Sequence, residues 1–188
     1  METFARGRII AAAKDSGAVL RACQSGVDTV FLLGGDILSV GQEIRRIRAC
    51  GKQAFMHIDL VDGIARDAAG VRYVARCIAP DGVISTKAAL LRVAQEEGLT
   101  TVQRIFLVDS SSLETGARLV QASSPDYVEV MPGLVPLAIA HLRATLRQPV
   151  IAGGMITQPE QVRVALTAGA VAVSTSSQAL WHLADPQA

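Results

Sequence analysis

Eight short apolar runs, separated by stretches of helical character, constrain the fold of this 188-residue chain more than any other feature. Three of the intervening stretches, 38–50, 69–78 and 159–170, repeat apolar residues at helical spacing, and the last opens with Pro159 in a helix-entry position. Strands that alternate with helices indicate parallel βαβ units. The predicted strands cover 8–13, 29–35, 53–59, 82–87, 101–108, 127–133, 149–154 and 170–175.

Two folds fit this alternation, an open doubly wound sheet and a closed eight-stranded barrel. Eight units of roughly 20–25 residues suit the barrel, although its usual length is ~250 residues. An open nucleotide-binding sheet usually carries a GxGxxG turn after its first strand, and "AAAKDSG" at 11–17 lacks it. We therefore predict an α/β fold, a compact TIM-like (β/α)8 barrel. It forms a single domain over 1–188, with a loose tail at 183–188.

The composition excludes several classes of protein. Half of the residues are hydrophobic, which fills one core, but no apolar run approaches the roughly 20 residues of a membrane helix. The N-terminus lacks a secretory signal, and the three cysteines are unpatterned, so we expect a cytoplasmic protein. No metal-ligand spacing is present, and we expect neither a metal nor a cofactor. The net charge of +1 requires any nucleic-acid contact to rest on a local patch.

The ends of the last two predicted strands carry small residues that suit phosphate binding. In (β/α) barrels the loops after strands seven and eight frequently hold a phosphate, because glycines let backbone N–H groups approach an oxyanion. The predicted phosphate-binding residues are Gly153, Gly154, Thr175 and Ser176. The same residues would also serve as a tight turn and a helix cap without any ligand.

Polar side chains within apolar strands form a second candidate set, because charged groups are costly to bury without a partner. The candidates for binding a small polyol are His57, Asp59, Gln103, Glu129 and Lys14. Of Gln103 and its neighbour Arg104, one should point into the barrel. The alternative is a satisfied polar layer inside the barrel. Whether these groups are poised for acid–base chemistry or only for binding stays open.

Basic residues gather on two consecutive predicted helices. They are Arg45, Arg46, Arg48, Lys52, Arg72 and Arg76. A solvated helix surface is one interpretation, and contact with an RNA phosphate backbone is the other. Aromatic residues are too few for a stacking platform, so such contact would be electrostatic and directed by shape.

Six runs in this order resemble the glycerol uptake operon antiterminator regulatory protein family of bacteria. The similarity extends from about residue 31 to Trp181, and Lys14 stands where the family tends to have a basic residue. Other phosphate-binding barrels share only the last two runs. The runs are "HIDLVDGI", "GVISTK", "QRIFLVDSS", "YVEVMPGLVP", "IAGGMI" and "GAVAVSTSSQALW".

The resemblance implies a barrel-shaped cytoplasmic regulator without catalytic turnover. Its effector would be glycerol 3-phosphate and its partner the leader mRNA of glycerol-catabolism genes, where it prevents premature transcription termination. The phosphate would then lie on Gly153, Gly154, Thr175 and Ser176. The near-neutral chain departs from the basic surface that such a role requires. Two alternatives remain: a small barrel enzyme acting on a triose- or glycerol-phosphate, and a barrel whose ligand stabilises a homo-oligomer.

Overall fold

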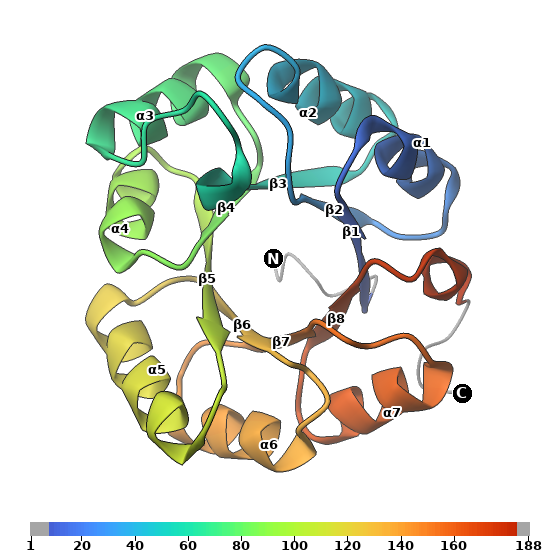
Figure 1. Ribbon diagram of the computed structural model, residues 1–188, viewed down its shortest axis with the longest axis vertical. Coiled ribbons are helices and arrows are strands. Elements are labelled where there is room, and N and C mark those ends of the chain that lie inside the picture. The colour runs from blue at the N-terminus through green and yellow to red at the C-terminus, as the bar shows by residue number, and fades with distance from the viewer. Residues whose placement is uncertain (1–7, 184–188) are drawn as a thin grey trace.

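The protein is a closed barrel of eight parallel strands, which confirms the predicted fold class. A computed structural model describes residues 8–183, and each strand pairs with its sequence neighbours until β8 closes the ring on β1 (Figure 1). The strands are β1 (Ile9–Ala13), β2 (Thr29–Leu32), β3 (Gln53–His57), β4 (Gly82–Ser85), β5 (Thr100–Phe106), β6 (Tyr127–Met131), β7 (Val150–Gly153) and β8 (Ala172–Thr175). Residues 184–188 of the predicted tail lie outside the described residues.

Helices cover the outside of the ring, one after each of the first seven strands (Figure 1). The stretch at 69–78, predicted as one helix, is an α-helix followed by a π-helical turn over Val74–Ile78. The predicted helices at 38–50 and 159–170 are present as α2 and α7. The α-helices are α1 (Ser16–Gln24), α2 (Val40–Ala49), α3 (Ala68–Tyr73), α4 (Ala88–Glu96), α5 (Ser110–Ser123), α6 (Pro136–Thr145) and α7 (Pro159–Thr167).

The barrel has two separate apolar regions. One fills the ring itself, with Phe31 and Phe55 tilted against each other at a centroid distance of 5.5 Å. The other lies between the outer face of the strands and the helices, and includes Ile44, Leu91 and Ile139. Alternate residues of each strand therefore face the two regions, as the two-residue period of a strand requires. The same alternation decides which polar side chains point into the ring.

Most strands end earlier than predicted. After Leu32 the chain leaves the ladder, and Gly35 takes a φ of +107°, which a glycine adopts without strain. After His57 a short 3₁₀ helix, η1 (Ile58–Leu60), follows β3. Asp59 therefore stands in a helical turn, so the prediction that it shares a strand face with His57 is wrong.

Helix α6 packs on the barrel through Ala138, Ile139 and Leu142, all buried. Leu137 on its other side is 84 % exposed. Among the helices of residues 8–183, none is both long and apolar enough to cross a membrane.

Candidate anion-binding site

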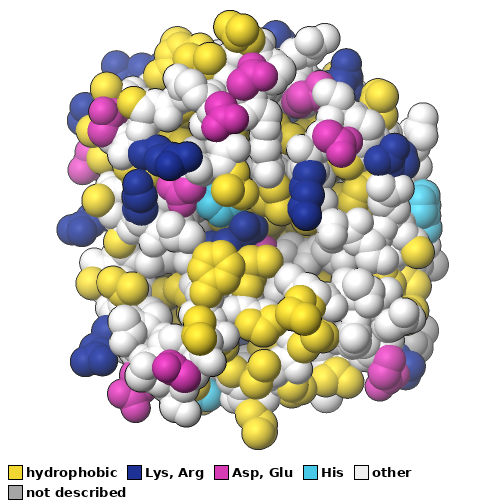
Figure 2. All heavy atoms as spheres, viewed as in Figure 1, with side chains coloured by type: hydrophobic (Ala, Val, Ile, Leu, Met, Phe, Trp, Pro, Cys, Tyr) yellow, Lys and Arg dark blue, Asp and Glu magenta, His cyan; other side chains and the backbone are white. Residues whose placement is uncertain are grey.

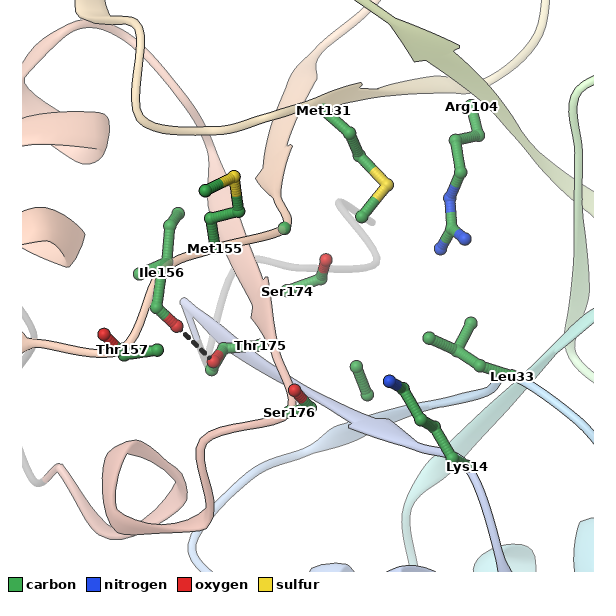
Figure 3. Close-up of a pocket in the computed structure, with 12 residues that line it drawn as sticks. Lys14, Leu33, Arg104, Met131, Met155, Ile156, Thr157, Ser174, Thr175 and Ser176 are labelled. Carbon is green, nitrogen blue, oxygen red and sulfur yellow. Dashed lines mark hydrogen bonds between the residues drawn. The ribbon is translucent and has the colours of Figure 1, made fainter.

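A cavity of about 210 Å³ opens at the carboxyl ends of the strands. Its wall comes from β1, β5, β6 and β8, and from the residues that follow β1, β2, β7 and β8 (Figure 3). In the space-filling view down the same axis, basic atoms are visible in the hollow at the centre of the ring (Figure 2). The lining residues are Ala12, Lys14, Leu33, Arg104, Met131, Gly154, Met155, Ile156, Thr157, Ser174, Thr175 and Ser176.

The end of β7 is shaped by two glycines with different roles. A Cβ on Gly153 would lie 2.6 Å from both Glu129 Oε1 and Ser174 Oγ, so only glycine fits there. Gly154 lines the cavity with a φ of +75°, and Met155 follows at +64°. Consecutive residues in this left-handed region turn the chain sharply away from the barrel. The turn leaves the backbone of Gly154 at the cavity wall.

The end of β8 is tied to the loop after β7. Thr175 Oγ1 donates to the carbonyl of Ile156 at 2.7 Å and accepts from the backbone N–H of Ser177 at 3.0 Å. Trp181 Nε1 donates to the Thr175 carbonyl at 2.8 Å. The Thr175 hydroxyl is thus used within the protein, whereas Ser176, beside it, is exposed and lines the cavity. Of the predicted phosphate residues, Gly154, Thr175 and Ser176 line the cavity and Gly153 lies behind it.

A buried polar network forms the inner wall. Arg104 on β5 and Glu129 on β6 are register partners, and Arg104 Nε donates to Glu129 Oε2 at 2.6 Å. Ser174 Oγ on β8 donates to the other oxygen, Glu129 Oε1. Glu129 is fully buried and Arg104 is 6 % exposed. The carboxylate therefore joins three strands and does not itself line the cavity.

Two buried nitrogen atoms, one of them on a member of this network, have no hydrogen-bond partner within residues 8–183. They are Arg104 Nη2 and His57 Nδ1. Burial lowers the pKa of His57 to about 4, and the positive charge of Arg104 adds to that shift. His57 is consequently neutral at physiological pH. It does not line the cavity.

Two other predicted polyol residues are also away from the cavity. Asp59 accepts from the Ser85 hydroxyl at 3.0 Å and from the Thr86 backbone N–H at 2.8 Å, which ties η1 to the end of β4. Gln103 accepts from the Ser123 hydroxyl of α5 on the outer face of the barrel. Gln103 therefore does not line the cavity, because strand alternation turns its neighbour Arg104 inward instead.

Lys14 is the one predicted polyol residue that lines the cavity. It follows β1, its side chain is exposed, and Figure 3 shows it directed into the cavity from the side opposite Arg104. It forms no salt bridge with another part of residues 8–183. No Asp or Glu of the described chain lines the cavity, so its two charged residues are both cations.

Arg104 and Ser174 are the cavity residues that sequence reasoning undervalued. Both could have been found from strand parity, because each is an even number of residues from an interior apolar residue of its own strand: Val102 precedes Arg104, and Ala172 precedes Ser174.

The basic residues predicted to contact RNA are largely engaged within the protein. Lys52 Nζ donates to the Ser25 and Val27 carbonyls, and Arg48 Nη1 to the Ala79 carbonyl. Three more of these residues form ion pairs, Arg46 with Glu43 and both Arg72 and Arg76 with Glu97. Arg45 alone of the six has no such contact within residues 8–183.

Side chains that could bind a metal ion do not gather anywhere in the described residues as a group of three or more. The cavity is lined by the Ser176 hydroxyl and two cations, a donor set that suits an anion rather than a metal.

The fold and the site together define the class of this molecule. It is a closed (β/α)8 barrel with a small cation-lined cavity at the carboxyl end of its strands. Residues 9–181 match the family described as glycerol-3-phosphate responsive antiterminator, and the chain belongs to that family. The resemblance noted in the sequence is thereby confirmed.

Two solved structures agree with this assignment. The glycerol uptake operon antiterminator regulatory protein of Listeria monocytogenes is 32 % identical, with a TM-score of 0.91 over 95 % of this chain and 96 % of that one. A glycerol uptake operon antiterminator-related protein of Thermotoga maritima is 33 % identical, with a TM-score of 0.82 over 92 % and 96 %. An uncharacterized Escherichia coli (strain K12) protein, YgcP, is 36 % identical over 94 % of this chain and 92 % of its own.

Barrel enzymes share the fold alone. Orotidine 5′-phosphate decarboxylase from Pyrococcus horikoshii is 18 % identical, with a TM-score of 0.68 over 95 % of this chain and 93 % of that one.

Proposed function

We propose that this protein is a glycerol-3-phosphate-responsive regulator that binds the leader of glycerol-catabolism mRNA and prevents premature transcription termination. Membership of the antiterminator family supports the regulatory role. The observation that best supports a phosphorylated ligand is the cavity at the ends of β7 and β8, into which Lys14 is directed. The protein would act in the cytoplasm, where leader RNA is made.

The phosphate of the ligand would lie against Gly154, Ser176 and Lys14. Backbone N–H groups beside the Gly154 turn and the Ser176 hydroxyl would supply hydrogen-bond donors, and Lys14 would supply a positive charge without an acidic partner in the described chain. A volume of about 210 Å³ equals about seven water molecules at ~30 Å³ each. A small phosphate ester such as glycerol 3-phosphate would fit in this space.

Binding without turnover agrees with the state of the acidic groups. A general acid or base must reach the reacting atoms and must be free to exchange a proton. Glu129 is fully buried and held by Arg104 and Ser174, and Asp59 is held by Ser85 and Thr86. Neither carboxylate lines the cavity. This arrangement favours a sensor over a triose-phosphate enzyme.

The experiment that tests the proposal measures RNA affinity with and without ligand. A fluorescent leader hairpin is titrated with protein in buffer, with glycerol 3-phosphate, with glycerol, and with inorganic phosphate. We expect glycerol 3-phosphate alone to tighten binding by about tenfold, within the usual range of allosteric coupling. Equal affinity in all four solutions would remove the sensing role.

The same samples are analysed for consumption of glycerol 3-phosphate. Formation of a product by the wild type, abolished in a folded Glu129→Gln variant, would support the enzyme alternative instead.

A further inference from the structure

The inner wall of the cavity contains an arginine whose hydrogen bonding is incomplete. Arg104 Nε is bonded to Glu129 at 2.6 Å, but Nη2 is buried and has no partner within residues 8–183. Buried donors are nearly always satisfied, and an unsatisfied donor on a charged group is especially costly. Arg104 lines the cavity, and Figure 3 shows its guanidinium directed into the open space. A ligand oxygen in the cavity would supply that acceptor.

The network around Arg104 holds this donor in a fixed direction. Glu129 binds Nε and is itself bound by the Ser174 hydroxyl, so the side chain is anchored through β5, β6 and β8. The absence of a side chain at Gly153 leaves room for the Glu129–Ser174 contact. Both carboxylate oxygens of Glu129 are engaged, which leaves Arg104 and not Glu129 to meet the ligand. Glu129 is thus a positioning residue.

The two cations of the cavity differ in how their charge is balanced. The positive charge of Arg104 is compensated by the buried carboxylate of Glu129 at 2.6 Å. Lys14 has no carboxylate partner within residues 8–183. A compensated cation offers directional N–H groups with little net charge, which suits a neutral oxygen, whereas an uncompensated one suits an anion.

The topology separates these two groups across the ring. Lys14 follows β1, which pairs with β8, whereas Arg104 is on β5, four strands away in the closed barrel of eight. A ligand with its phosphate at Lys14, Gly154 and Ser176 would extend its carbon chain toward Arg104 (Figure 3).

We infer that Arg104 is the specificity-determining residue of this site: its Nη2 donates to a hydroxyl oxygen of the polyol, while Lys14 takes the phosphate. The inference rests on the proposed function, because it assigns one residue to each end of the ligand that this function requires. It makes the site selective for a hydroxylated phosphate ester over a plain alkyl phosphate. A site built to hydrogen-bond a hydroxyl discriminates strongly against an analogue that lacks it.

The test compares three probes by calorimetry: glycerol 3-phosphate, propyl phosphate and inorganic phosphate. Propyl phosphate keeps the phosphate and the carbon chain but lacks both hydroxyls. We expect the wild type to bind glycerol 3-phosphate at least about tenfold more tightly than propyl phosphate, as the loss of a hydrogen bond to a charged group implies. Equal affinities for these two probes in the wild type would overturn the inference without any variant.

Two variants separate the ends of the site. Arg104→Lys keeps a cation beside Glu129 but removes Nη2, so it should reduce the preference for glycerol 3-phosphate over propyl phosphate to about threefold or less. Its affinity for propyl phosphate should stay within about twofold of the wild type. Lys14→Gln should weaken all three probes by a similar factor and keep the preference. An unchanged preference in Arg104→Lys would contradict the inference.

Controls make each outcome decisive. Arg163→Gln on the surface of α7, where Arg163 pairs with Glu160, should leave all affinities unchanged. If Arg104→Lys does not fold, the double variant Arg104→Gln with Glu129→Gln replaces the ion pair by a neutral pair and should lose the preference in the same way. Failure of the wild type to bind glycerol 3-phosphate at all would remove the proposed function itself. Normal binding with an unchanged preference in the variants would remove only the role of Arg104.

Discussion

Gly153 shows at the scale of one residue how closely the inner wall is packed. A methyl group there would lie 2.6 Å from Glu129 Oε1 and from Ser174 Oγ, well inside van der Waals contact. Because both groups belong to the buried network, neither can move without breaking a hydrogen bond. The glycine at this position is thus required by the network and not only by a ligand.

We predict that Gly153→Ala lowers the free energy of unfolding by about 1–3 kcal/mol, the usual cost of overpacking a well-packed site. It should also displace Arg104 and Ser174 and weaken ligand binding. Urea unfolding measures the first effect and calorimetry the second.

Gly41→Ala is the matched control. This glycine lies in α2, and the added methyl group would meet only the flexible end of Arg45, at 3.4 Å. Alanine in a helix is favoured over glycine by about 0.5–1 kcal/mol. Similar losses of stability in both variants would contradict the account of Gly153.

His57 provides a second prediction at this scale, through pH. Its pKa is about 6.5 in the unfolded chain and about 4 in the folded protein, because burial and then Arg104 disfavour the charged form, while Asp59 opposes them. Between these values the unfolded state binds a proton that the folded state does not. The free energy of unfolding should therefore fall as pH falls from 6.5 to about 4, and His57 should contribute no pH dependence above 6.5.

The contribution of His57 is on the order of 3 kcal/mol over that interval. It is measured as the difference between the urea-unfolding profiles of the wild type and His57→Gln from pH 4 to pH 8. The subtraction removes the acid titration of the carboxylates that both proteins share. Parallel profiles would mean that His57 titrates normally in the folded state.

At the scale of elements, the contact between the β7–α7 loop and the end of β8 gives the cavity its shape. Thr175 Oγ1 bridges Ile156 and Ser177, and Trp181 binds the Thr175 carbonyl. We predict that Thr175→Val, which removes both side-chain hydrogen bonds and leaves the Ile156 carbonyl unpaired, costs about 1–3 kcal/mol of stability. Urea unfolding measures this loss.

Thr175→Ser keeps the hydroxyl and distinguishes positioning from direct contact with the ligand. The stability of Thr175→Ser should be close to that of the wild type. In both variants, phosphate affinity should fall only to the extent that stability falls. If Thr175→Val abolished phosphate binding with no change in stability, the hydroxyl would contact the phosphate directly.

The sequence predicted that each of the eight strands exists, because each strand has its own run of apolar residues. Strand ends were less readable, as β3 illustrates. The run "FMHID" continues the apolar pattern to Asp59, but Asp59 turns to bind Ser85 and Thr86 at the end of β4. Ser85 and Thr86 are 26 and 27 residues away from Asp59 in the chain, so no local pattern could indicate these contacts.

At the scale of the whole molecule, the cavity and most of the predicted RNA-binding residues lie at opposite ends of the barrel. Arg48 and Lys52 contact loops that precede β4 and β2, and Arg76 contacts Glu97 after α4. These loops lead into the amino ends of strands, away from the cavity at the carboxyl ends. If these residues form the RNA surface, the effect of ligand binding on RNA affinity would have to be transmitted from one end of the barrel to the other.

Salt dependence tests which basic residues contact RNA. Each phosphate contact contributes about 0.9 to the slope of log affinity against log salt concentration for a duplex and about 0.7 for a single strand. We predict that Arg45→Gln lowers the slope by about one such contact. Arg76→Gln should not, because Glu97 already holds that guanidinium at 2.8 Å. Unchanged slopes in both variants would place the RNA surface elsewhere on the molecule.

The sequence by itself determined the class of fold, the existence of the eight strands and the family. Apolar periodicity and the order of short motifs are local properties, and eight βα units leave few ways to bury their apolar faces other than a closed ring. Only the tertiary structure decided which polar residues meet. Arg104, Glu129 and Ser174 come together because closing the barrel brings β5, β6 and β8 around one interior, and the same closure leaves Gln103 outside.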